Sequence, residues 1–189
     1  MGSNPAAPTN FHTADGPRCR FRARQWWLSP TEYRAFLDRF YRLSSSAILD
    51  SNGMVDKLVG DEAIGLFLAG VSGQQHAVAA IQAARSILDG ASRDDASPSG
   101  PIPVGAAVHT GAAFVGSTGA EGVVSDFTAL GDVVDTTARL ASHAPAGELL
   151  VSVDAIRAAD ADSSAHEHRT LAVRGRTEVV AMRSSTRDN

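Results

Sequence analysis

The stretch from Pro103 to Ser152 constrains the fold most, because its apolar pattern changes period twice. Apolar runs over Val104–His109 and Ala112–Val115 are separated by little more than Gly111. Two short apolar runs joined so closely predict a β-hairpin. The glycine- and serine-rich segment that follows, residues 116–125, is typical of a loop.

Helical spacing begins directly after this segment. Apolar and small residues recur three and four positions apart after Asp132, which suits the first turn of a helix. Pro145 and Gly147 end this helical pattern, and Leu149–Ser152 is again an apolar run of strand type. The central stretch therefore predicts two strands, a loop, a helix and a further strand.

The segment upstream adds a well-capped helix and a second hairpin. Ser29 can cap a helix that has Pro30 in its first position and Glu32 to complete a capping box. The apolar stripe of this helix continues to about Leu49. Strands over residues 54–58 and 63–67 then enclose Asp61 and Glu62 at a tight turn.

The remaining patterns complete an α+β order of elements. They predict helices over residues 77–88 and 153–160 and a final strand pair over residues 168–173 and 179–183. Helices that cover an antiparallel-rich sheet satisfy this order. We expect a loose tail over residues 1–16, one domain over residues 17–183 and a frayed end over residues 184–189.

Composition and charge exclude several classes of function. With 189 residues, 43% hydrophobic and 20% charged, the chain has the composition of one ordinary globular domain. Its net charge of -4 gives no reason to expect a nucleic-acid or anionic-membrane partner. Cys19 is the single cysteine, which fits a reducing, cytoplasmic compartment. No apolar run approaches the ~20 residues of a membrane helix.

Five segments in order resemble the catalytic domain of class III nucleotide cyclases, the adenylyl and guanylyl cyclases, and most resemble its short bacterial members. They are VDKLVGDEAIGLF, VGAAVHTGAAFVG, DFTALGDVVDTTARLAS, GELLVS and LAVRGRTEVVAM. The resemblance covers roughly residues 28–183. It implies a ferredoxin-like βαββαβ core whose first strand lies between Pro17 and Leu28.

The resemblance also implies an activity and an assembly. Such a domain converts ATP to 3′,5′-cyclic AMP and pyrophosphate, a phosphorus–oxygen lyase reaction of signal transduction, with Mg²⁺ or Mn²⁺. It works as a head-to-tail homodimer with sites at the interface. One subunit would supply Asp61, and the other would supply the remaining site residues.

Particular residues match the motifs of the family. Lys57 matches the lysine that contacts adenine N1, and Thr128 stands where an acceptor for the adenine amino group is expected. Asp61 matches a metal-binding aspartate in the hairpin turn, and Arg139 matches an arginine that stabilises the transition state. Arg176 matches a phosphate-binding lysine, with Arg174 as the competing candidate.

Each of these side chains also has an ordinary structural interpretation. Asp61 and Glu62 suit a solvated turn, and Lys57 suits the surface of a strand. Thr128 fits any strand, and Arg176 fits a loop. The sequence alone leaves these alternatives open.

Two departures from the family pattern bear on activity. Asp135 replaces an expected asparagine, and it lies one helical turn before Arg139, with which it can form an ion pair. The segment PRCRFRARQWWL contains no acid where the family carries its first metal-binding aspartate, so Asp15 is the nearest candidate ligand. The alternative hypothesis is therefore a catalytically impaired homologue that binds nucleotide or serves as a dimerisation or regulatory module.

Overall fold

Four strands at one end of the sheet form a ferredoxin-like core. The computed structural model describes residues 4–13, 29–93, 100–120, 124–164, 166–172 and 177–183. Strands lie side by side in the order β2-β3-β1-β4-β7-β9-β8. Their bounds are β1 Asn4–Thr13, β2 Met54–Val59, β3 Glu62–Leu68, β4 Val104–Val108, β7 Glu148–Ser152, β8 Glu167–Leu171 and β9 Thr177–Arg183. Within this order β4, β1, β3 and β2 are the four strands of a βαββαβ unit, so the predicted fold class is confirmed.

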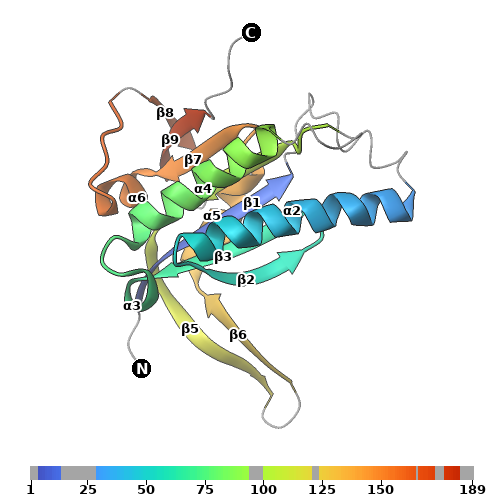
Figure 1. Cartoon of the computed structure of the whole chain (residues 1–189). Helices are drawn as coiled ribbons and strands as arrows, with labels where there is room; N and C mark the ends of the chain where they lie inside the picture. Colours follow the sequence, from blue (N-terminus) through green and yellow to red (C-terminus); the bar gives the residue numbers. More distant parts are fainter. Residues whose placement is uncertain are drawn as a thin grey trace.

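Helices cover both faces of the sheet (Figure 1). On one face lie α2 Pro30–Asp50, α4 His76–Ser92 and the short α6 Val153–Ala158. On the other face α5 Asp132–Ser142 packs against β1 and β4. The four-residue helix α3 Ala69–Ser72 joins β3 to α4 and has no counterpart in the sequence prediction.

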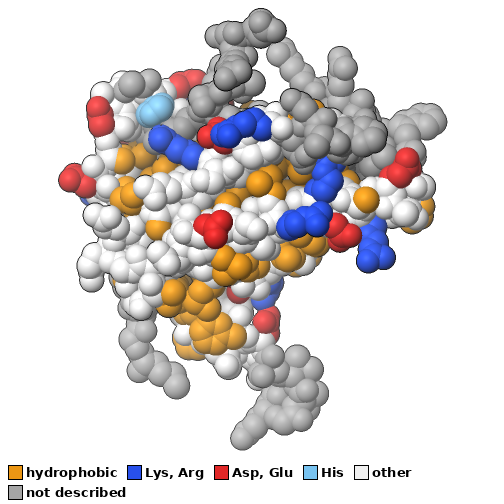
Figure 2. All heavy atoms as spheres, viewed as in Figure 1, with side chains coloured by type: hydrophobic (Ala, Val, Ile, Leu, Met, Phe, Trp, Pro, Cys, Tyr) orange, Lys and Arg blue, Asp and Glu red, His pale blue; other side chains and the backbone are white. Residues whose placement is uncertain are grey.

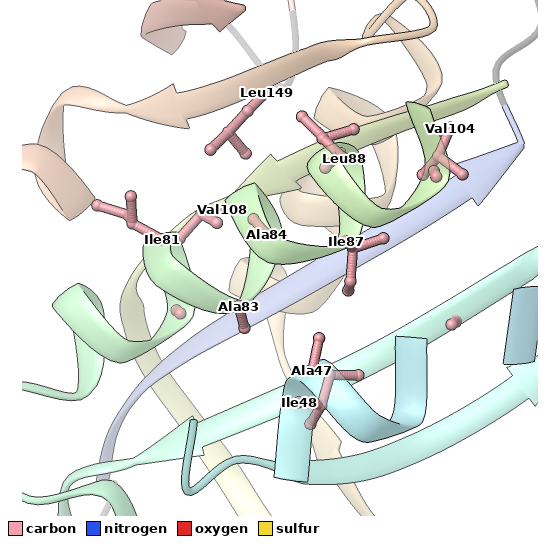
Figure 3. Close-up of a cluster of buried hydrophobic side chains, with 14 of the residues drawn as sticks. Ala47, Ile48, Ile81, Ala83, Ala84, Ile87, Leu88, Val104, Val108 and Leu149 are labelled. Carbon is pink, nitrogen blue, oxygen red and sulfur yellow. The ribbon is translucent and has the colours of Figure 1, made fainter. Parts of the chain in front are cut away.

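The main core fills the space between the sheet, α2 and α4. Ile48 of α2 and Ile87 of α4 are fully buried, and Val108 and Leu149 of the sheet belong to the same buried cluster (Figure 3). Successive residues of a strand face opposite sides of a sheet. Accordingly Ala107 and Leu150 pack on the other face with Leu140 of α5, so β4 and β7 are buried on both faces.

The predicted start of α2 is confirmed in its details. The Ser29 hydroxyl accepts a hydrogen bond from the Glu32 amide, and the Ser29 amide donates to Glu32 Oε2 at 2.8 Å. Pro30 lies in the first turn, where no amide donor is needed. The hydrogen bonds from Ser29 lower the pKa of Glu32.

The prediction for residues 104–125 is wrong in two respects. Strand β5, Gly111–Ala120, pairs with β1 and with β6, Val124–Leu130, and among the described residues no pairing joins it to β4. The glycine- and serine-rich segment is largely strand rather than loop. Seven residue pairs from Phe114↔Leu130 to Ala120↔Val124 form a long antiparallel hairpin that projects from the body (Figure 1).

The first strand also differs from the sequence prediction. The structure has β1 at Asn4–Thr13, inside the expected loose tail, and pairs it with β3 and β4. The backbone of this segment fills the position between β3 and β4 although its sequence carries no strand-like periodicity. The predicted location of the first strand, residues 17–28, lies outside the described residues.

Candidate functional site

The β2–β3 hairpin positions three of the polar side chains of the candidate site. Asp56 and Lys57 lie on β2, and Asp61 lies in the turn that leads into β3. Gly60 has a φ of 58° in this turn, a left-handed conformation that glycine adopts without strain. The Tyr41 hydroxyl of α2 donates a 2.6 Å hydrogen bond to the Gly60 carbonyl, which ties the turn to the body. Asp61 is half-buried there.

A cluster of four polar side chains joins β2 to β6. The Lys57 ammonium donates to the Asp126 carboxylate, and Thr128 Oγ1 donates to Asp56 Oδ2 at 3.1 Å. We call Asp56, Lys57, Asp126 and Thr128 the β2–β6 cluster. The structure thus brings the two predicted base-reading residues, Lys57 and Thr128, to one place.

Burial differs within this cluster. Thr128 is only 5% exposed, whereas Lys57 and Asp126 reach solvent. The hydrogen bond to Asp126 raises the pKa of Lys57. Burial raises the pKa of Asp56, while the hydrogen bond from Thr128 and the charge of Lys57 act in the opposite direction.

Sequence reasoning missed Asp56 and Asp126 as members of the site. Both are next to or near matched residues, Asp56 beside Lys57 and Asp126 two positions before Thr128. Only the packing of β2 against β6 shows that they contact the matched side chains. An acid next to a matched lysine was the one signal available in the sequence.

The two predicted residues of α5 are exposed. Asp135 lies in the first turn of the helix and Arg139 in the last. Gly131 precedes the helix with a φ of 138°, and its carbonyl accepts from Val134. An apolar face with Val133 and Leu140 is buried, which leaves Asp135 and Arg139 toward solvent.

The described residues do not assemble a metal site. No group of three or more His, Cys, Asp or Glu side chains suited to a metal ion occurs in the described part of the chain. Asp61 is the one predicted ligand that the structure describes, and β1 ends at Thr13. Asp15 lies outside the described residues, as do Arg174 and Arg176.

Comparison with known proteins identifies the fold. No protein-family model matches the sequence, and no curated protein sequence matches it either. Among solved structures, the guanylyl cyclase Cya2 matches with a TM-score of 0.82 at 22% identity, over 100% of this chain and 97% of that one. The adenylyl cyclase CyaB from P. aeruginosa matches with a TM-score of 0.77 at 23% identity, over 100% of both chains.

A third match concerns base specificity. The catalytic core of a rhodopsin-guanylyl cyclase with converted specificity, in complex with ATPαS, has a TM-score of 0.79 at 16% identity, over 96% of each chain. The chain described here therefore has the fold of a class III nucleotide cyclase catalytic domain. Because adenylyl and guanylyl cyclases both match, the fold alone does not choose the base.

The helices give one further finding. Among the described residues, no helix has the length and apolar character needed to cross a membrane.

Proposed function

We propose that this chain is an adenylyl cyclase domain that converts ATP to 3′,5′-cyclic AMP and pyrophosphate at sites between two copies of itself. The contact between β2 and β6 supports the proposal most. It joins Lys57, a donor suited to adenine N1, to Thr128, whose oxygen can accept from the adenine amino group. Adenine presents an acceptor at N1 and a donor at its amino group, and guanine presents the reverse at both positions.

The reaction assigns a task to the basic residues. The substrate's 3′ oxygen bonds to the α-phosphorus, and the bond from that phosphorus to the oxygen that bridges it to the β-phosphorus breaks. Pyrophosphate leaves with this bridging oxygen, and the hydroxyl proton passes to solvent water. Positive charge that faces the phosphates stabilises this transition state. Arg139 and Arg176 are the side chains that we propose for this task. A carboxylate at Asp135 opposes it, because it brings negative charge within one helical turn of Arg139.

Exposed apolar side chains support the assembly of two copies. Phe114, Phe127 and Leu130 of the β5–β6 hairpin are 44%, 52% and 49% exposed. Figure 2 shows hydrophobic surface where this hairpin leaves the body. Apolar side chains gathered in this way are typical of a protein–protein interface. In the proposed homodimer Asp61 of one copy faces Lys57, Thr128, Asp135, Arg139 and Arg176 of the other.

The metal ion remains a proposal that rests on one described side chain. We propose Mg²⁺ or Mn²⁺ as the cofactor and Asp61 as a ligand, with Asp15 as the nearest further carboxylate in the sequence. The described residues alone do not complete such a site. The acid-free segment PRCRFRARQWWL and the carboxylate of Asp135 near Arg139 favour a second candidate function, a homologue that binds nucleotide and dimerises without efficient turnover.

A complementation experiment tests the proposal. Asp61→Ala homodimers should be inactive and Lys57→Met homodimers should keep at most about a tenth of the wild-type activity, because each change affects both sites of the dimer. After subunit exchange, about half of the dimers carry both variants, and each of these keeps one intact site. We expect the mixture to recover about a quarter of the wild-type cyclic AMP production. If the wild-type protein is active but the mixture of the two variants recovers no activity, the shared site is contradicted. If the wild-type protein binds ATP without turnover, the second function is supported.

A further inference from the structure

An irregularity in β2 aims two consecutive side chains at the same neighbouring strand. The register between β2 and β3 shifts between Val55, which pairs with Gly65, and Lys57, which pairs with Ile64. Asp56 is therefore the extra residue of a β-bulge. Consecutive side chains of a regular strand point to opposite faces, and a bulge re-aims them. Here Asp56 and Lys57 both contact β6.

The contact between Asp56 and Thr128 has a defined direction. An ionised carboxylate can only accept hydrogen bonds, so the Thr128 hydroxyl is the donor in its 3.1 Å bond to Asp56 Oδ2. Once this proton is committed, Thr128 Oγ1 can only accept from a third group. A ligand atom that approaches Thr128 must then be a donor.

The burial of the pair strengthens this constraint. Thr128 is 5% exposed, so water has little access to replace the bond. The second carboxylate oxygen, Asp56 Oδ1, is buried and has no hydrogen-bond partner among the described residues. A buried carboxylate oxygen without a hydrogen bond lowers the stability of the folded state, which points to a role for this carboxylate other than stability.

We propose that Asp56 is a specificity-determining positioning residue that makes Thr128 a hydrogen-bond acceptor toward the base. The amino group of adenine is a donor, whereas guanine carries the acceptor O6 in the same place. Thr128 therefore pairs with adenine and is repelled by O6 of guanine. This inference rests on the proposed function, because it requires that the chain binds a nucleoside triphosphate.

Equilibrium binding separates this role from catalysis. The ligands are the α,β-methylene analogues of ATP and GTP, which cannot release pyrophosphate, and the quantity compared is the ratio of their dissociation constants. Asp56→Leu replaces both carboxylate oxygens by methyl groups of similar shape. It frees the Thr128 hydroxyl to donate, so we expect the preference for the adenine analogue to fall about tenfold.

Two further variants make the test specific. Asp56→Asn keeps an amide oxygen that can accept from Thr128, so it should retain most of the adenine preference. Thr128→Val removes the hydroxyl, and in this background Asp56→Leu should have no additional effect on the preference. Asp38→Asn is the matched control, since it removes an exposed carboxylate on α2 that pairs with Arg34.

The possible results of these binding measurements separate the role of Asp56 from the proposed function. An unchanged preference in Asp56→Leu, or additive effects of Asp56→Leu and Thr128→Val, would overturn the role of Asp56. If Asp56→Leu does not fold, Asp56→Ala removes the same acceptor, and the same loss of preference is required. Failure of the wild-type chain to bind either analogue overturns the proposed function together with this inference. Binding of both analogues with a preference independent of residue 56 overturns this inference alone.

Discussion

Replacing Lys57 by methionine separates recognition of the base from stability of the fold. The ion pair between Lys57 and Asp126 is partly solvated, with the two side chains 34% and 56% exposed. Pairs of this kind contribute about 0–1 kcal/mol to stability. In a chain of this length 1 kcal/mol corresponds to about 2–4 °C in Tm. We therefore expect Lys57→Met to lower Tm by less than about 4 °C.

The expected effect on catalysis is larger. A hydrogen bond from a charged donor contributes about 1.5–3 kcal/mol, and every 1.4 kcal/mol is a factor of about ten. Loss of the proposed bond from Lys57 to adenine N1 should lower kcat/KM for ATP by about ten- to a hundredfold. The assay is the rate of cyclic AMP formation over a range of ATP concentrations, with Tm measured on the same preparations.

Asp126→Asn is the matched control for this prediction. It weakens the same ion pair but keeps the Lys57 ammonium, so its loss of kcat/KM should be much smaller than that of Lys57→Met. The reasoning is refuted if Lys57→Met cyclises ATP as efficiently as the wild-type chain. It is equally refuted if the loss of activity follows a fall in Tm of 10 °C or more.

Three further predictions concern the fold. Arg169 donates to both carboxylate oxygens of Glu148, which is 5% exposed, so Arg169→Met should cost about 2–4 kcal/mol in urea unfolding. Adding Glu148→Met should recover most of that loss; no recovery would contradict an uncompensated buried charge. A methyl group at Gly105 would lie 2.2 Å from the Ala144 carbonyl oxygen, so Gly105→Ala should lower Tm, and an unchanged Tm would exclude this close contact. Burial lowers the pKa of His109, so the unfolded chain binds more protons below about pH 6.5. Wild-type Tm should therefore fall more between pH 7 and pH 5 than that of His109→Gln, and equal falls would contradict this.

Local sequence signals predicted the elements whose start and end are chemically marked. The capping box of Ser29 and Glu32 indicated the start of α2, and the structure contains both of its hydrogen bonds. The β2–β3 hairpin was predicted because two apolar runs flank a short turn with Gly60 and Asp61. In these places the local pattern and the tertiary structure favour the same conformation.

Long-range pairing decided the elements that the sequence did not predict. Residues 116–120 include Gly116 and Gly119, and glycine weakens a strand, yet the segment pairs with β6 over its whole length. The pairing of β1 with β3 and β4 likewise depends on partners far away in the chain. Short-range propensity contains no information on such partners.

The candidate site was predicted in part for the same reason. Motif matches named Lys57 and Thr128, and the structure brings them together through contacts with Asp126 and Asp56. The bulge that turns Asp56 toward β6 is a property of the pairing between β2 and β3. Motif spacing therefore gave the residue types, whereas the relative placement of β2 and β6 gave their contacts.

The most direct test of the proposed activity is the product made by the purified chain. The chain is incubated with ATP or with GTP in the presence of Mn²⁺, and Asp61→Ala protein is assayed in parallel. We predict cyclic AMP from ATP, little cyclic GMP from GTP, and no product from Asp61→Ala protein of wild-type Tm. Cyclic AMP formation that persists in Asp61→Ala protein, or a folded dimer that forms no cyclic nucleotide, would contradict the proposed cyclase.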